Sequence, residues 1–245
     1  MTTAAPQDQL RLLDLQALDT RIQQLTHAKK THATLARIAQ LDQQIADLHG
    51  SLVDSRTAVT DLKRELAKAE ADVEQVVTRT AKNQARLDSG ALGAKDALAV
   101  TDEMASLTRR QGALEEVQLE VMEKLDAHQE ALDQVEAAHQ ELVDAKSAAE
   151  SERDAAFEEI NTQGRALVTE RKELAAAIDA GLVAVYDQLR TRLGGTGAAA
   201  LRGRTCEGCG LELNPTDLAA AHAAAPDQVV RCEECGRILV RVSDQ

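Results

Sequence analysis

All four cysteines of the chain lie near its C-terminal end, as two Cys-x-x-Cys pairs. The pairs are Cys206 with Cys209 and Cys232 with Cys235, and a glycine follows each pair. This spacing lets two thiolates reach one ion from a single tight turn, and the glycine allows the backbone to fold around the sulfur atoms. Two such turns supply four thiolates in a tetrahedron, a ligand set that suits Zn²⁺. We therefore expect one structural zinc ion bound by all four cysteines.

Two other roles for the cysteines remain open. A rubredoxin-like iron site has the same ligand set, and a Cys-x-x-Cys pair can act as a redox dithiol. No thioredoxin-like strand–helix–strand pattern surrounds either pair, which disfavours the dithiol. The first ten residues, MTTAAPQDQL, have no basic start and no apolar run, so we expect no signal peptide there. We therefore expect a cytoplasmic protein in a reducing compartment, where paired cysteines bind metal more often than they form disulfides.

The cysteines must be held by a small, mostly β module. The stretches 198–205, 229–231 and 237–242 are predicted to be strands, and Asn214 and Pro215 are typical of a helix start. The glycines of GGTG, residues 194–197, end the helix that precedes them. We predict a C4 zinc-ribbon domain over residues 194–245.

Residues 1–193 are predicted to form an antiparallel coiled-coil helical hairpin with its turn near residues 88–95. Apolar residues recur every seven positions in both arms, as expected for a coiled-coil seam. In the first arm the two rows are Ile38, Ile45, Leu52, Val59, Leu66, Val73, Thr80 and Leu87, and Leu41, Leu48, Ser55, Leu62, Ala69, Val76 and Asn83. The fold class is therefore mainly α, a long hairpin with a small C-terminal β zinc ribbon. A single bent rod that dimerises in parallel is the alternative, and the oligomeric state stays open.

The hairpin also predicts a register and a joint. Residues whose numbers add to about 182 should face each other, and the second arm should run to about residue 192. The seam of the first arm is lost between His27 and Thr34, and the facing part of the second arm is roughly 148–155. We expect a kink or flexible joint there. The apolar stripe at the end of the second arm, which contains Ile178, Leu182 and Tyr186, needs a cover, and we expect the C-terminal domain to supply it.

The net charge of −13 belongs to the arms, since residues 188–245 contain seven arginines and seven acidic residues. A phosphate-binding surface is therefore expected only at the C-terminal end. The candidate contacts to RNA or DNA are an arginine run without an intervening acid, and two arginines of the ribbon: Arg190, Arg192, Arg202, Arg204, Arg237 and Arg241. The same arginines could instead pair with carboxylates of the ribbon or of the coil.

Residues 186–240 contain the segment YDQLR, a glycine-rich turn and the pattern CEGCG…NP…VVRCEECGRILV. In these features the chain resembles the bacterial C4-type zinc-ribbon proteins that carry a long N-terminal helical hairpin. Family members often have an aromatic residue after GRIL, where this chain has Val240. The resemblance implies a non-enzymatic cytoplasmic protein. It further implies nucleic-acid contact through the ribbon and adaptor- or chaperone-like protein binding through the helices.

Three functions follow from these residues. The first is an adaptor that binds nucleic acid at the ribbon end and an unidentified protein along the coil. The alternative is a protein-interaction or chaperone-like rod without nucleic-acid binding. The third function is that of transcript-cleavage factors, whose helical hairpins carry acidic residues at the tip. Acidic residues near the turn are its only support, so it is the weakest of the three hypotheses. The chain shows no nucleophile–base pair and no phosphate-binding glycine loop, and four thiolates leave zinc no open position, so we do not expect an enzyme. No apolar run of about 18 residues occurs, so we expect no membrane span.

Overall fold

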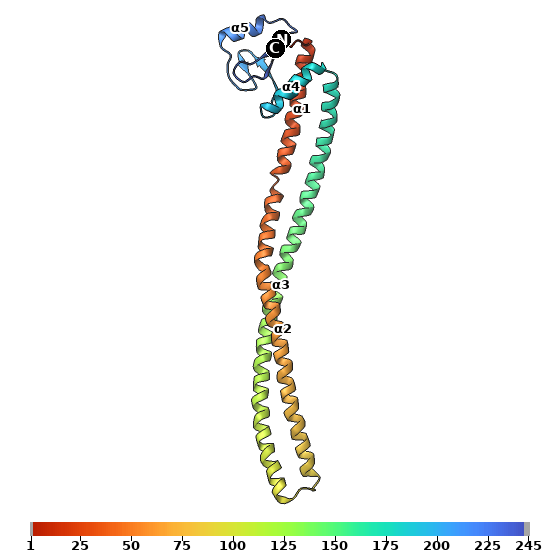
Figure 1. Ribbon diagram of the computed structural model, residues 1–245, viewed down its shortest axis with the longest axis vertical. Coiled ribbons are helices and arrows are strands. Elements are labelled where there is room, and N and C mark those ends of the chain that lie inside the picture. Colours follow the sequence, from red (N-terminus) through yellow and green to blue (C-terminus); the bar gives the residue numbers. More distant parts are fainter. Residues whose placement is uncertain (1, 243–245) are drawn as a thin grey trace. The chain divides into compact units, whose positions relative to one another are not determined.

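The computed structural model describes residues 2–242 (Figure 1). Its elements, in chain order, are α1 (Pro6–Lys30), α2 (Ala33–Asp88), α3 (Ala94–Ala176), α4 (Ala180–Arg192), β1 (Ala198–Arg202), β2 (Thr205–Cys206), α5 (Pro215–Ala223), β3 (Val230–Arg231) and β4 (Ile238–Arg241). The predicted fold class is confirmed, because long helices precede a small C-terminal sheet. The described residues divide into two compact units, one made of residues 2–35 and 151–242 and the other of residues 36–150.

In the unit formed by residues 36–150, α2 and α3 pair through the predicted seam. Buried seam residues form two apolar clusters, one around Ile38, Leu41 and Ala149 and one around Leu52, Val59 and Leu132. Ion pairs between the two helices flank the seam, such as Arg56–Glu136 and Asp42–Lys146. The turn between them contains Gly90 at φ 65°, a left-handed conformation that glycine adopts without strain. The heptad pattern therefore identified the buried face of both helices.

The predicted register is right near the turn and wrong farther away. The numbers of Arg79 and Glu103, which form an ion pair, add to 182. Those of Arg56 and Glu136 add to 192 and those of Asp42 and Lys146 to 188, so ion pairs farther from the turn join residues offset from the predicted register. Heptad rows fix which face is buried, but they do not fix the axial offset between two helices.

The predicted break in the first arm lies between α1 and α2. Thr31 ends α1, and the Nδ1 atom of His32 lies 2.7 Å from the Thr34 hydroxyl at the start of α2. In the second arm α3 continues through residues 148–155 as one helix, and the boundary between the two compact units falls between residues 150 and 151. A break between two helices is therefore found here in the first arm alone.

The second arm does not run to residue 192 as one helix. It ends at Ala176, and α4 begins at Ala180 with Asp179 as its cap, whose carboxylate accepts a hydrogen bond of 2.9 Å from the Leu182 amide. The apolar stripe of α4 is covered, as predicted, although α1 contributes to the cover as well as the C-terminal sheet. This core contains Leu12, Leu15, Ile178, Leu182, Tyr186, Leu189, Ala198, Ile238 and Val240.

The C-terminal sheet has the strand order β2-β1-β4-β3, with β1 and β4 parallel and both outer pairs antiparallel. Alternate residues of β1 and β4 point to opposite faces, as in any strand. Ile238 and Val240 belong to the core with α1 and α4, whereas Leu239 belongs to a second core around the cysteines. One thin sheet thus supports both the helices and the cysteine turns.

The N-terminal residues pair with the segment that precedes β3. Thr3 forms an antiparallel bridge with Gln228, and the Ala4 amide donates to the Asp227 carbonyl at 2.8 Å. No pattern in the sequence indicates this pairing. Within residues 2–242, none of the helices is long and apolar enough to cross a membrane.

Candidate metal centre and ribbon arginines

The two cysteine pairs lie in turns of the same design. Cys206 ends β2 and Cys232 follows β3, so each pair leaves the edge of the sheet. In the first turn the Gly210 amide donates to the Cys206 carbonyl at 2.8 Å, and in the second the Gly236 amide donates to the Cys232 carbonyl at 2.8 Å. Gly210 and Gly236 have φ values of 72° and 73°, which explains why a glycine follows each pair.

The four sulfur atoms all lie within 4.8 Å of one another. The Sγ atoms of Cys206 and Cys235 are 4.0 Å apart, as are those of Cys209 and Cys232. A tetrahedral zinc site with Zn–S bonds of about 2.3 Å requires S···S distances of about 3.8 Å. A disulfide requires about 2.05 Å. The arrangement therefore fits one zinc ion held by all four cysteines.

The surroundings of the sulfur atoms are unequal. The pKa of Cys206 is raised to about 12, mainly because the side chain is buried, and burial also raises the pKa of Cys232. Burial acts in the same direction on Cys235, but hydrogen bonds from the backbone and side chain of Arg237 outweigh it and lower its pKa to about 7. A bound divalent cation would stabilise all four thiolates and cross-link the two turns. With four protein ligands, such an ion has a structural role.

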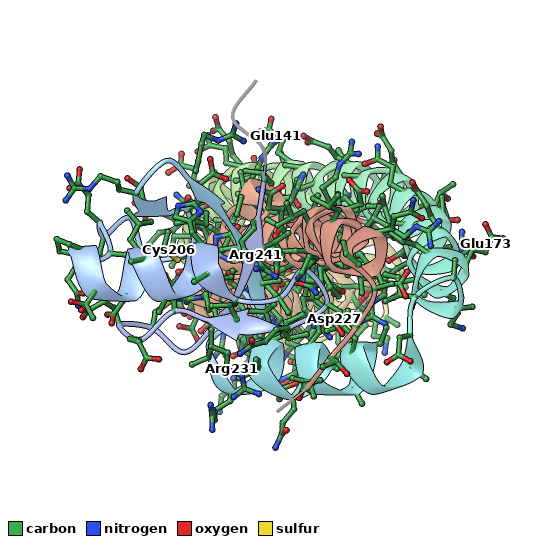
Figure 2. All side chains as sticks on the ribbon, turned by 90° about the horizontal axis from the view of Figure 1, so that it is seen from above. Glu141, Glu173, Cys206, Asp227, Arg231 and Arg241 are labelled. Atoms are coloured by element: carbon green, nitrogen blue, oxygen red, sulfur yellow. The ribbon has the colours of Figure 1, made fainter. Side chains whose placement is uncertain are left out.

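Three of the six candidate arginines hold the fold together. Arg241, labelled with Cys206 in Figure 2, donates to backbone carbonyls that follow or end α5, those of Ala221, Ala224, Ala225, Pro226 and Gln228. Arg237 donates to the carbonyl of Thr196 at 3.1 Å and to that of Leu193 at 3.4 Å. These guanidinium groups are already engaged by the protein's own backbone.

Arg190 also has partners within the fold. Its Nε atom lies 3.4 Å from a carboxylate oxygen of Asp19, which is buried in α1, and 3.7 Å from Asp187. Asp19 thus provides a carboxylate partner for Arg190, although it precedes Arg190 by more than 170 residues in the sequence.

The other three candidates are exposed. Arg202 pairs with Glu207 at 2.7 Å, Arg204 pairs with Glu212 at 3.5 Å, and Arg192 lies at the exposed end of α4. Exposed ion pairs contribute about 0–1 kcal/mol, so they compete only weakly with another anion. The structure therefore does not gather the six arginines into one basic surface.

Two known domain families match this chain. The CT398-like coiled coil hairpin domain matches residues 15–194, and the C4-type zinc ribbon domain matches residues 205–239. The chain belongs to the CT398-like coiled-coil hairpin family. An uncharacterized protein of Mycobacterium tuberculosis is 32% identical to this family member over 234 residues, covering 96% of this chain and 95% of the relative.

Solved bacterial structures share the fold of this CT398-like protein. One, from Mycobacterium smegmatis, is 34% identical with a TM-score of 0.84, and the match covers 98% of this chain and 100% of that chain. Another is CT398 from Chlamydia trachomatis, 22% identical with a TM-score of 0.64, covering 96% of this chain and 98% of that chain. The bacterial zinc-ribbon resemblance seen in the sequence is thereby confirmed.

Two further residues at the metal centre of this CT398-like protein were not predicted from the sequence to lie there. Gly208, inside the first pair, lies so close to β1 that a Cβ atom there would be 2.8 Å from the Cβ of Ala199. Arg237, assigned to nucleic acid in the sequence, donates to the sulfur of Cys235. The glycine inside the first Cys-x-x-Cys pair could have predicted close packing against the turn. The contact of Arg237 with Cys235 could not be predicted, because it depends on the folded arrangement of the second turn.

Proposed function

We propose that the protein is a non-catalytic adaptor that binds partner proteins along its helices. The engagement of Arg190, Arg237 and Arg241 inside the fold is the observation that carries this proposal. It leaves the ribbon few free cations, and four cysteine ligands leave its metal no open position. The helices, by contrast, expose large apolar side chains, including Leu98 at 70% and Leu119 at 59%.

Purification of the tagged full-length protein from native cells, with and without nuclease, tests the adaptor proposal. Proteins should co-purify in stoichiometric amounts and survive nuclease treatment. A double variant, Cys206→Ser with Cys235→Ser, separates partners that need the ribbon from those that need only the helices. Loss of every partner after nuclease would contradict the proposal.

Nucleic-acid binding at the ribbon end is the second candidate function. Arg192, Arg202 and Arg204 are exposed, and the two carboxylates that pair with them are also exposed. Such pairs are weak enough for phosphate to replace the carboxylates. Binding by these residues alone would have little sequence preference and would fall steeply with salt.

A triple variant, R192Q/R202Q/R204Q, tests this second function. Binding to single-stranded RNA at low salt should be lost or strongly reduced, with a salt slope lowered by about 0.7 for each phosphate contact removed. The variant K63Q/R64Q/K68Q, on an exposed stretch of α2, makes the same change in net charge and should bind as the parent does. Equal binding by both variants, or none by the parent, would reject nucleic-acid binding at this surface.

A further inference from the structure

A groove lies between α1 and α3 in the unit formed by residues 2–35 and 151–242. Its volume is about 770 Å³, and its apolar lining comes from Ile22, Leu25, Ile160 and Val168. These side chains are only partly buried, and Val168 is 39% exposed. Leu12 and Leu15, earlier in α1, are fully buried. At the groove, α1 and α3 therefore leave apolar side chains partly exposed to solvent.

Gly164 keeps part of this groove open. It lies inside α3 and lines the groove, and a Cβ atom placed on it would meet no heavy atom within 4 Å apart from the adjacent backbone of its own helix. A glycine in a helix interior costs about 1 kcal/mol relative to alanine. No neighbouring atom would clash with a Cβ atom at position 164. Close packing within the chain therefore does not explain why a glycine is present there.

The charged side chains that line the groove are both basic, whereas the chain as a whole is acidic. Lys29 and Arg165 line the groove, and its lining includes no carboxylate, although the chain has 41 acidic and 28 basic residues. Lys29 is held by Asn161 at 2.9 Å and lies over the ring of Phe157. Arg165 pairs with Glu158, and both side chains are more than two-thirds exposed, so a partner's carboxylate can compete for the guanidinium group.

We infer that this groove binds an amphipathic α-helix of another protein, with acidic residues beside its apolar stripe. The inference rests on the proposed adaptor function and gives it a site. Residues 160–168 extend along about 12 Å of helix axis, enough for roughly two turns of a partner helix. Apolar side chains spaced i, i+3 and i+7 on that helix would enter between Ile22, Ile160 and Val168. Its carboxylates would meet Lys29 and Arg165.

A displayed library of 18-residue helical peptides provides the probe. Each peptide carries Leu, Ile or Met at i, i+3, i+4 and i+7, and the flanking positions vary among Glu, Gln and Lys. Selection on the full-length protein should enrich peptides with Glu beside the apolar stripe. The expected preference comes from the two cations of the groove.

Matched glycine variants then locate the binding site. Gly164→Leu fills the groove and should weaken binding of an enriched peptide at least tenfold. Gly112→Leu is the control, because Gly112 also lies inside α3, a Cβ atom placed on it would likewise meet no heavy atom within 4 Å, and it does not line the groove. Arg165→Glu, a change at an exposed position, should shift the preference from Glu-flanked to Lys-flanked peptides. Circular dichroism establishes that each variant is folded.

The inference is overturned if no peptide is enriched, if the enriched peptides are flanked by Lys, or if Gly164→Leu binds as tightly as Gly112→Leu. Sedimentation of the proteins without peptide tests whether a second copy of the chain occupies the groove instead. If the parent self-associates and only Gly164→Leu abolishes this, a second copy fills the groove and a foreign helix does not. If nuclease-resistant partners remain bound to Gly164→Leu in cells, the adaptor function stands and the groove assignment fails.

Discussion

Asp19 is a buried carboxylate on which three other side chains converge. It is 3% exposed, and it accepts hydrogen bonds from Arg171 at 3.0 and 3.3 Å and from the Tyr186 hydroxyl at 2.8 Å. Arg190 approaches it at 3.4 Å. A buried charge is tolerated when it is paired and hydrogen-bonded in this way, and removal of one partner of a buried pair costs about 3–5 kcal/mol. One residue thus joins α1, α3 and α4.

Tyr186 should make the stability of this region sensitive to alkaline pH. Burial, together with its hydrogen bond to Asp19, raises the pKa of Tyr186 well above its usual value of about 10. The stability from this shift is fully present below about pH 10, the pKa in the unfolded chain, and is lost as pH rises toward the folded pKa. The free energy of unfolding should therefore fall above pH 10 by up to about 1.4 kcal/mol per pH unit.

The variant Tyr186→Phe provides the comparison. It should be less stable at neutral pH by about 1.5–3 kcal/mol, because a hydrogen bond to a charged group is lost, and the difference should narrow above pH 10. The chain contains one Tyr and no Trp, so absorbance at 295 nm reports the ionisation of Tyr186 alone. An ordinary titration near pH 10 in the folded protein would contradict the predicted shift.

The seam of the α2–α3 pair contains one polar layer near the turn. Asn83 is 6% exposed, and its side-chain nitrogen and the Thr80 hydroxyl have no hydrogen-bond partner among the described residues. A polar residue at a seam position such as that of Asn83 can set the register or mark a frayed helix end. Its burial excludes a frayed end, since the side chain lies inside the seam.

Asn83→Leu should stabilise the unit formed by residues 36–150. The substitution removes an unsatisfied buried amide, whose desolvation costs about 1–3 kcal/mol, and keeps a similar volume. The thermal midpoint followed by circular dichroism should rise. Asn83→Asp should lower it, because a charge would be buried without a partner. A midpoint that falls with leucine would indicate that the amide is required for the correct register.

Among the helices and strands, the features that depend on residues close together in the sequence could be predicted from it. Asn214 and Pro215 located the start of α5, and the seven-residue rows located the buried face of α2 and α3. The break before α4 was missed because residues 177–181 continue the apolar spacing and the Asp179 cap lies among them. The engagement of Arg241 could not be predicted, because its acceptors are backbone carbonyls, which carry no residue identity.

Taken as a whole, the C-terminal region has two separate cores. One joins α1, α4 and one face of the sheet, and it is made of large apolar side chains such as Leu12, Leu182 and Tyr186. The other surrounds the cysteines and contains three leucines and two alanines, which are Leu201, Leu213, Leu239, Ala199 and Ala221. The first can persist on hydrophobic burial, whereas the second depends on a bound ion.

Removal of zinc should therefore disorder only part of this region. Elemental analysis of the purified protein should find about one zinc per chain. After chelation, hydrogen exchange should become fast in α5 and in both cysteine turns, while α1, α3 and α4 keep their protection. Circular dichroism should retain most of its helical signal, because α5 has only 9 residues.

A double variant, Cys209→Ser with Cys232→Ser, should reproduce the exchange pattern of the chelated protein. Simultaneous loss of protection in α4 would show that the two cores are one cooperative unit, contrary to this expectation.

The core shared by α1, α4 and the sheet also has a consequence for synthesis on the ribosome. Residues 36–150 contain both partners of their own seam, so they can pair while the rest of the chain is still being made. Leu12 and Leu15 are made early but are covered by Ile238 and Val240, roughly 220 residues later. At about 5–20 residues per second, α1 therefore exposes its apolar face for roughly 10–45 s. During that interval the newly made N-terminal helix presents the surface that nascent-chain chaperones bind.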